Sequence, residues 1–187
     1  MTGPIDRDEA LLLLRENLGN ENLIRHCLAT EAVMRTLARD RGEDQDLWGL
    51  TGLLHDLDYE RTADSHDRHG LVAGEMLEGR LPEEYLRAIK AHNGENNGVE
   101  RISDLEHLLA AGESITGLIV AVALVYPEQK LEPVRSGSVT KRMRMTAFAR
   151  SVPRETIMEC EKAGYDLDVF VRLSLDAMKG IAGEIGL

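Results

Sequence analysis

Several segments of the chain repeat apolar residues every three or four positions, and each of these stripes also contains an ionisable side chain. The repeat follows one face of an α-helix, so each segment is predicted to be a helix that buries this face. A buried charge or imidazole is costly without a partner, so the fold must bring compensating groups together. The ionisable residues on these faces are His26, His55, Asp56, His69, His92 and Glu113.

The composition also favours helices. Aromatic residues make up only 4% of the chain, while Leu, Ala, Glu and Arg are abundant, which is typical of helices and not of sheets. A chain of 187 residues is long enough for one domain with a substantial core and too short for two ordinary domains with a linker. We therefore expect a single all-α domain over residues 1–187.

Capping residues and helix breakers indicate where the helices begin and end. Asp6 with Glu9, and Ser103 with Glu106, have the spacing of a capping box at a helix start, and Gly42 suits a helix C-terminus. A polar loop is expected at residues 58–68 and a breaker at 93–98. The expected helices span residues 6–19, 22–41, 44–57, 69–79, 82–93, 103–125, 138–149, 153–163 and 167–187.

The charge of the chain excludes some classes of function. Its formal net charge is −11, which disfavours binding to extended nucleic acid or to an anionic membrane. The most apolar stretch, Ile115 to Val125, is shorter than the ~20 residues that span a bilayer, and the N-terminus does not resemble a signal peptide. Cys27 and Cys160 lie within apolar helical patterns, as packing residues in a reducing compartment would. We expect a cytoplasmic protein.

A shared metal ion would satisfy all the ionisable residues on the buried faces at once. A single histidine on an apolar stripe is more often a core residue than a ligand, and Glu113 alone would suggest a buried salt bridge. Histidines and carboxylates that converge from separate helices favour a metal site instead. His66, in the polar loop, is a weaker candidate. His107 falls off the buried face of its helix and is expected to be exposed.

The order of these residues resembles that of the HD-domain superfamily of metal-dependent phosphohydrolases. His26 comes first, His55 and Asp56 follow within the run Gly-Leu-Leu-His-Asp, and a late acid, Glu113, comes last. The likeness extends over about residues 20–125, and residues 53–60 and 116–119 look like a bacterial branch of predicted HD hydrolases. The resemblance implies a bundle of five core helices, with a C-terminal helical extension over about residues 130–187. It also implies that His26, His55, Asp56 and Glu113 bind a divalent metal.

The chain departs from the family pattern at two positions. The last ligand is usually Asp, whereas Glu113 is one methylene longer. Many relatives continue after the His-Asp pair with Ile or Val, Gly and a phosphate-binding Lys, but here Leu57, Asp58 and Tyr59 follow. Other residues would therefore have to hold the phosphate.

His69 and His92 match the places where binuclear members of the superfamily carry extra histidines. Six candidate ligands would suffice for two ions bridged by Asp56. Mixed imidazole and carboxylate ligands suit Mn, Fe, Co, Ni or Zn better than Ca or Mg. If only one ion binds, His69 and His92 would contact the phosphate of the substrate instead.

The reaction that the resemblance implies is hydrolysis of a nucleotide or another small phosphate ester. The metal would lower the pKa of a water and polarise a phosphoryl oxygen. Asp56 is expected to orient that water, and His69 or His92 to act as an acid or a phosphate clamp. The partner would thus be a small phosphorylated molecule.

Positive charge for such a substrate is expected from the basic segment between Arg135 and Arg150, which contains no acid. Lys141, Arg142 and Arg144 are its candidate phosphate-binding residues, although a solvated basic helix face explains the same segment. Arg25, Arg61 and Arg68 lie near the expected ligands in sequence and are rival clamps.

Two other functions remain open at this stage. A few HD-domain relatives hold a di-iron centre and cleave C–C or C–P bonds with O₂, and Tyr59 and Glu60 would be gating side chains in such an oxygenase. The chain would alternatively be a binding module in which the metal only stabilises the fold. A closed metal site without an adjacent pocket would favour that module.

Overall fold

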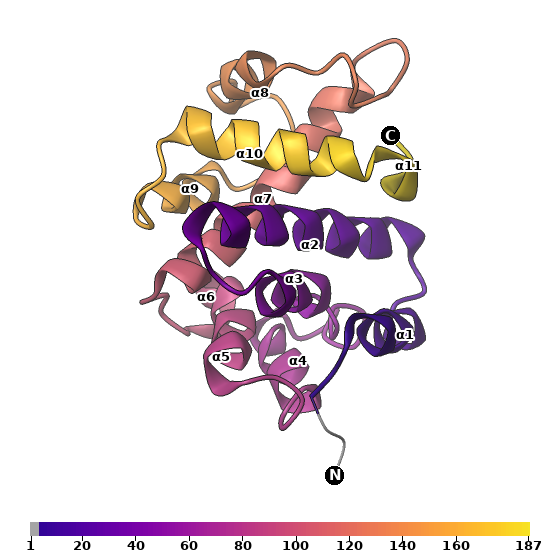
Figure 1. Cartoon of the computed structure of the whole chain (residues 1–187), viewed down its shortest axis with the longest axis vertical. Helices are drawn as coiled ribbons and strands as arrows, with labels where there is room; N and C mark the ends of the chain where they lie inside the picture. Colours follow the sequence, from indigo (N-terminus) through magenta and orange to yellow (C-terminus); the bar gives the residue numbers. More distant parts are fainter. Residues whose placement is uncertain (1–3) are drawn as a thin grey trace.

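The computed structural model describes residues 4–187, and over this range the chain is all-helical and contains no strand (Figure 1). The predicted fold class is confirmed. The N-terminal part contains α1 (Arg7–Asn17), α2 (Glu21–Arg41), α3 (Gln45–Leu54), the 3-10 turn η1 (His66–Arg68) and α4 (Leu71–Met76). The middle part contains α5 (Glu83–His92), α6 (Gly94–Asn97) and α7 (Asp104–Leu124). The C-terminal part contains α8 (Ser136–Met143), α9 (Arg154–Ile157), the 3-10 turn η2 (Met158–Glu161), α10 (Leu167–Gly180) and α11 (Ala182–Ile185).

Local capping chemistry sets several helix ends as predicted. The Asp6 side chain accepts a hydrogen bond from the backbone N–H of Glu9 at the start of α1. Ser103 and Glu106 form a full capping box at the start of α7. Gly42 ends α2 in the left-handed conformation, with φ of 75°. These ends were predictable because the groups that satisfy the free backbone N–H and C=O groups lie within a few residues of them.

The two long helices, α2 and α7, form the centre of the molecule. Helix α3 packs against one side of α2, and α10 lies along the other side (Figure 1). Helix α7 crosses behind them and also contacts α5 and α9. Fully buried side chains such as Leu14, Met34, Leu53, Leu109 and Phe170 fill the space between these helices. Burial of this apolar surface is the main stabilising contribution to the fold.

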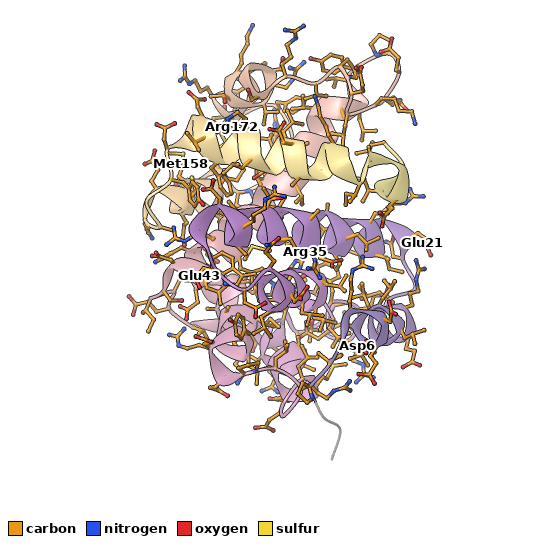
Figure 2. All side chains as sticks on the ribbon, in the orientation of Figure 1. Asp6, Glu21, Arg35, Glu43, Met158 and Arg172 are labelled. Atoms are coloured by element: carbon orange, nitrogen blue, oxygen red, sulfur yellow. The ribbon has the colours of Figure 1, made fainter. Side chains whose placement is uncertain are left out.

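Close contact between α2 and α3 brings their functional ends together. A Cβ atom at Gly52 would lie 2.9 Å from the carbonyl oxygen of Thr30 and 2.9 Å from a side-chain carbon of Met34, so only glycine permits this approach. On the outer side of the pair, Arg35 donates to Glu31 on its own helix and to Asp46 at the start of α3 (Figure 2). The spacing between α2 and α3 is thereby set on both sides.

Helix α7 is long and apolar enough to pass as a membrane span, with a hydropathy of 1.7 over its most apolar window. In this fold 67% of that window is buried inside the protein. The core helix of a soluble protein passes the same test of length and composition. The apolar helix is also longer than the stretch from Ile115 to Val125 that the sequence suggested.

Several predicted boundaries were wrong. Helix α3 ends at Leu54 and not at residue 57, and α4 begins at Leu71 and not at residue 69, so His55, Asp56 and His69 lie in turns. The expected helix at 138–149 is the shorter α8, and that at 153–163 is α9 followed by η2. The predicted breaker at 93–98 contains the short helix α6. In these regions tertiary hydrogen bonds, described below, outweigh the helical periodicity.

Candidate metal centre

Four imidazole rings converge in the space between α2, α3, α5 and α7. His26 comes from the middle of α2, His55 directly follows α3, His69 follows η1, and His92 is the last residue of α5. The ring centroids of His26 and His55 are 5.1 Å apart, as are those of His55 and His92, and those of His69 and His92 are 4.8 Å apart. The structure thus brings together all four histidines that the sequence singled out.

Two of these rings are oriented by the helices from which they come. The Nδ1 atom of His55 donates to the carbonyl oxygen of Gly52 at 2.8 Å, and that of His92 donates to the carbonyl oxygen of Ile89 at 2.6 Å. Each acceptor lies three residues earlier, where the C-terminal carbonyls of a helix are free. Because Nδ1 carries the proton, Nε2 of the neutral ring presents a lone pair to the centre of the cluster.

His69 is held by a buried carboxylate. Asp58 is fully buried, and one of its oxygens accepts a hydrogen bond from Nδ1 of His69 at 2.7 Å. Its other oxygen accepts from the backbone N–H groups of Gly70 and Ala73, both at 2.9 Å. The carboxylate therefore orients the imidazole and caps the start of α4 with the same side chain.

Thr116 orients the fourth ring. Its hydroxyl donates to the carbonyl oxygen of Glu113 at 2.7 Å, so it accepts from Nδ1 of His26, 3.0 Å away. Nε2 of His26 then lies 3.2 Å from Nε2 of His55. Two imidazole lone pairs at this distance repel each other unless a proton or a metal ion lies between them.

Asp56 lies within reach of all four rings. Its Oδ1 atom is 3.1 Å from Nε2 of His69, 3.4 Å from that of His55 and 3.5 Å from that of His92. Its Oδ2 atom is 3.7 Å from Nε2 of His26. Burial alone would raise the pKa of Asp56, but the surrounding imidazoles outweigh burial and hold its pKa well below the usual range. The carboxylate is therefore ionised.

Burial and neighbouring charges also set the other protonation states. Burial lowers the pKa of His55 to about 3, so this ring is neutral, as a metal ligand must be. Burial would lower the pKa of His69 too, but hydrogen bonds to Asp56 and Asp58 raise it to about 9. Burial raises the pKa of Glu113 above its ordinary value, and the nearby His26 opposes this shift. Without a cation, the centre thus combines a strongly ionised carboxylate with an imidazolium at His69.

The donor set fits one or two divalent transition metals. Ligand atoms of His26, His55 and Glu113 lie within 4.8 Å of one another, as do those of His55, Asp56 and His92. The two groups share His55, and Asp56 also approaches His69. Imidazole nitrogens mixed with carboxylate oxygens suit Mn, Fe, Co, Ni or Zn. The Nδ1 atom of each of the four histidines donates to an acceptor in the protein. The Nε2 atoms are therefore the ones left to bind a metal.

One side of the cluster is open. A cavity of 470 Å³ lies beside it, and side-chain exposure rises from 1% at His55 to 24% at His26. Tyr59 packs edge-on against His69, with ring centroids 5.3 Å apart, and is 41% exposed at the cavity. The exposed His66 also lines it. The residues around the cavity are Leu23, His26, Asp56, Tyr59, His66, His69, His92, Asn93, Glu95, Asn96, Glu113, Pro153 and Thr156.

The structure does not bring every candidate residue to this cavity. Its wall contains none of the predicted phosphate-binding residues of α8, because that helix packs against α7 and α10 at one end of the molecule (Figure 1). There Arg142 stacks on Phe148, 5.5 Å from the ring centroid. The predicted phosphate-binding residues at this end of the molecule are Lys141, Arg142 and Arg144.

Other expected contributors are also placed elsewhere. Arg68 pairs with Glu75 at 3.0 Å, and neither Arg61 nor Arg25 lines this cavity. Glu60 accepts hydrogen bonds from the backbone N–H groups of residues 19 and 20, and so fixes the link between α1 and α2. His107 was expected to be exposed, but its side chain is 13% exposed and donates to Glu159 at 2.8 Å.

Sequence reasoning missed the residues that support the histidines. Asp58 follows the His-Asp pair by two residues and lay in a segment predicted to be a polar loop. Asn93 and Asn97 lay in the predicted breaker, yet their side-chain amides both donate to the carbonyl oxygen of His69 at 3.1 Å. Asn and Asp in breakers commonly bond to backbone, but the partner here is 24 or more residues away in sequence. That pairing carries no local signal.

The comparison with known families agrees with this geometry. The family model of the HD domain matches residues 23–123, which include the six candidate ligands and Asp58. No curated protein and no solved structure matches the chain. HD domains are typical of metal-dependent phosphohydrolases, and their known members bind divalent metals. The matched segment covers more than half of the chain, so the chain belongs to the HD-domain family.

Proposed function

We propose that this protein is a divalent-metal-dependent phosphohydrolase that acts on a nucleotide or another small phosphate ester. The observation that carries the proposal is the arrangement of Nε2 atoms around Asp56. Four imidazoles whose Nδ1 atoms donate to protein acceptors turn Nε2 towards one ionised carboxylate, next to an open cavity. Burial of these lone pairs and of the carboxylate costs free energy unless a cation binds them, so the arrangement suits a metal ion.

The metal would be held by His26, His55, Asp56 and Glu113, with His69 and His92 as ligands of a second ion. When bound, it would supply a Lewis acid and lower the pKa of a water. Asp56 belongs to one ligand group, lies within 3.7 Å of Nε2 of His26 in the other, and would orient the attacking water. Glu113 accepts a hydrogen bond from the hydroxyl of Ser114 at 2.6 Å, which leaves its other oxygen, 3.9 Å from Nε2 of His26, for the metal.

His69 and His92 would contact the phosphate if only one ion binds. Their Nε2 atoms lie 3.2 Å apart and both residues line the cavity. The pKa of about 9 at His69 means that this ring carries a proton at neutral pH when no metal is bound. A protonated His69 would donate to a phosphoryl oxygen or to the leaving group.

The substrate is proposed to be small and soluble. The cavity of 470 Å³ has the size of a small-molecule site, and the net charge of −11 disfavours extended nucleic acid. A nucleotide fits both conditions, and we place the enzyme in the cytoplasm, where small phosphorylated molecules are abundant and the buried free thiols of Cys27 and Cys160 stay reduced.

Metal analysis of the purified protein, followed by a phosphatase and phosphodiesterase screen with Mn, Co, Ni and Mg, tests the proposal. His55→Ala and Asp56→Ala should each lose metal and turnover together. Activity should fall at least ~1000-fold, because the bound metal is what would activate the attacking water. Asp67→Ala, at an exposed position of η1, is the matched control and should retain both. Full activity in chelator-treated protein or in His55→Ala would contradict the proposal.

A di-iron oxygenase is the second candidate. It is favoured by the two ligand groups, which share His55, and by the packing of Tyr59 against His69. Oxygen consumption by iron-loaded protein, without phosphate release, would support the oxygenase and overturn the phosphohydrolase. A module that uses the metal only for stability is disfavoured because the cluster opens to a cavity.

A further inference from the structure

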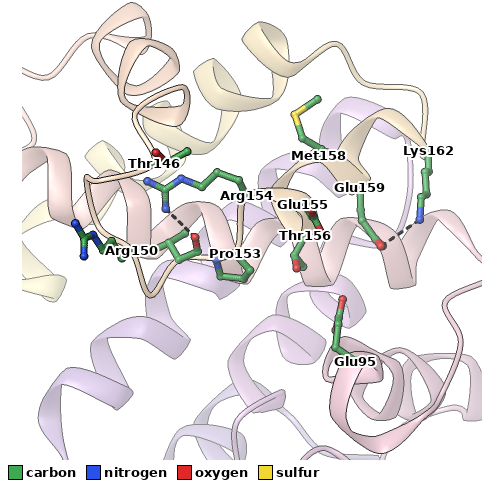
Figure 3. A pocket seen from close by; sticks show the side chains of 11 residues that line it. Glu95, Thr146, Arg150, Pro153, Arg154, Glu155, Thr156, Met158, Glu159 and Lys162 are labelled. Atoms are coloured by element: carbon green, nitrogen blue, oxygen red, sulfur yellow. Dashed lines mark hydrogen bonds and ion pairs between the residues drawn. The ribbon is translucent and has the colours of Figure 1, made fainter.

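A second cavity, of 710 Å³, lies next to the one beside the metal centre. Figure 3 shows the side chains that line this second cavity. The two share Glu95, Pro153 and Thr156 in their walls, so they lie side by side. The second cavity is walled by the segment from Thr146 to Lys162, which follows the matched HD region. A substrate whose reacting phosphate lies at Asp56 would reach this wall with its remote end.

The loop that walls this cavity is held by hydrogen bonds within it. The guanidinium of Arg154 donates to the carbonyl oxygens of Ala149 and Val152, both at 2.7 Å, and to that of Phe148. Ala149 is held in the left-handed region, with φ of 43°, which is unfavourable for a residue with a Cβ. One half-buried cation thus binds three carbonyls, and Arg150, the residue after Ala149, lies at the cavity.

The charges around the cavity leave Arg150 available. Arg150 is exposed, and no carboxylate within residues 4–187 lies within ion-pair distance of it. Two of the wall carboxylates, Glu95 and Glu159, are both paired with Arg101, whose side chain is 8% exposed. The third, Glu155, is exposed. Of the three cations in this wall, Lys162 pairs with Glu159 and Arg154 donates to backbone carbonyls, so Arg150 is the one that no residue between 4 and 187 already binds.

A free hydroxyl marks the junction of the two cavities. Thr156 is 7% exposed, lines both cavities, and its hydroxyl forms no hydrogen bond with any other residue between 4 and 187. The hydroxyl is therefore free to donate to, or accept from, a ligand in either cavity. In Figure 3 Thr156 and Pro153 lie between Arg150 and Glu95.

We propose that this second cavity binds a further phosphate group of the substrate, remote from the one that is cleaved, through Arg150 and the Thr156 hydroxyl. The inference rests on the proposed phosphohydrolase function and narrows it. The enzyme should prefer substrates with at least two phosphate groups, such as nucleoside di- or triphosphates, over simple monoesters. Arg150 is also the last residue of the basic segment noted in the sequence, and the only one of its cations that lines this cavity in the part of the chain described.

The test compares ATP with p-nitrophenyl phosphate, which has a single phosphate, on the Mn-loaded full chain. Arg150→Glu should raise the KM for ATP at least ~10-fold, as expected for loss of one charge-assisted contact, and leave the KM for p-nitrophenyl phosphate unchanged. Thr156→Val should raise the KM for ATP by a smaller factor. Arg172→Glu, on the outer face of α10 (Figure 2), is the matched charge reversal and should change neither KM.

Three outcomes would overturn the inference. The first is an equal effect of Arg150→Glu on both substrates. The second is an equal effect of Arg150→Glu and Arg172→Glu, which would indicate only the overall field. The third is an effect of charge reversal at Arg144, the residue that follows α8, without one at Arg150. If no phosphate ester is hydrolysed, the proposed function fails, and calorimetry with tripolyphosphate decides the inference: binding to the wild type and to Arg150→Glu with the same affinity overturns it, and weaker binding to the variant supports it.

Discussion

Asp58 shows how a single buried carboxylate can organise a site without being a candidate metal ligand. It stands where many relatives have glycine, between the His-Asp pair and the position of the phosphate-binding lysine, which is Tyr59 here. Its two oxygens accept from His69, Gly70 and Ala73, all at 2.7 to 2.9 Å. A carboxylate that fixes the orientation of a histidine tunes the affinity of the metal which that histidine binds.

Asp58→Asn should weaken metal binding ~10- to 100-fold, because an amide cannot accept all three hydrogen bonds and its NH₂ opposes a donor. Stability should fall by about 2 kcal/mol through the unsatisfied N–H groups at the start of α4. Competitive titration with a metal indicator and urea denaturation measure the two effects. Asp64→Asn, at an exposed position in the same loop, should show neither, and unchanged metal affinity in Asp58→Asn would refute the role assigned to this residue.

At the scale of elements, the turn between η1 and α4 decides where His69 points. Gly70 has φ of 83°, which favours glycine, and a Cβ there would lie 2.9 Å from the carbonyl oxygen of Ile89 and 3.2 Å from the ring of His92. The turn therefore packs directly on the last residues of α5. Asn93 and Asn97 hold the same turn from α6 through the carbonyl of His69.

Gly70→Ala should destabilise the protein by about 2–4 kcal/mol, through backbone strain together with overpacking against α5, and should displace His69 and His92. Thermal unfolding and metal affinity measure the two consequences. Gly79→Ala is the matched control, since Gly79 has φ of 72° and a Cβ there would meet no atom within 4 Å, so only strain of about 1 kcal/mol is expected. Equal effects of the two substitutions would show that contact with α5 is unimportant.

At the scale of the whole molecule, one ion-pair network joins the C-terminal part to the metal site. Arg101 pairs with Glu95 and with Glu159 of η2, and it donates to the carbonyl oxygens of Ala91 and His92 at the end of α5. Glu159 also accepts from His107 of α7. Burial opposes ionisation of Glu159, but hydrogen bonds from Arg101, His107 and Lys162 lower its pKa from 4.5 to about 2.

The low pKa of Glu159 predicts how its contribution to stability depends on pH. Because the folded pKa lies below the ordinary value, the stabilisation is fully present above about pH 4.5 and is lost as pH falls towards about 2. Glu159→Gln should therefore lower the free energy of unfolding at pH 7 by about 1–2 kcal/mol, a range reduced for solvent screening. Urea denaturation of both proteins between pH 7 and pH 2.5 should show this difference shrink on acidification.

Glu161→Gln serves as the control for this pH series, since Glu161 is exposed on the same turn, η2, and forms no ion pair in the described part of the chain. Its difference from the wild type should be small at every pH. A difference at Glu159→Gln that stays constant from pH 7 to pH 2.5 would show that the network does not depend on the ionised carboxylate.

The sequence by itself determined the helical class and several helix ends, and it singled out six candidate ligands that the fold brings together. These features have short-range signals: a period of three or four residues, capping residues next to the groups they satisfy, and polar side chains on apolar faces. His26, His92 and Glu113 were placed correctly because they lie within helices whose periodicity shows which face is buried. His55, Asp56 and His69 join the same cluster although they lie in turns and not on helices, and their role as ligands stays a prediction.

Only the tertiary structure decided which other residues serve the site. The bonds of Asp58, Thr116 and Asn97 to the ligand-bearing segments span up to 90 residues of sequence, and no periodicity reports such a pairing. The same holds for positive charge: the basic segment was visible in the sequence, but packing of α8 against α10 places most of it away from the cavity beside the metal centre and leaves Arg150 at the adjoining one. Local patterns specify what a segment buries, whereas the long-range packing of helices specifies what it meets there.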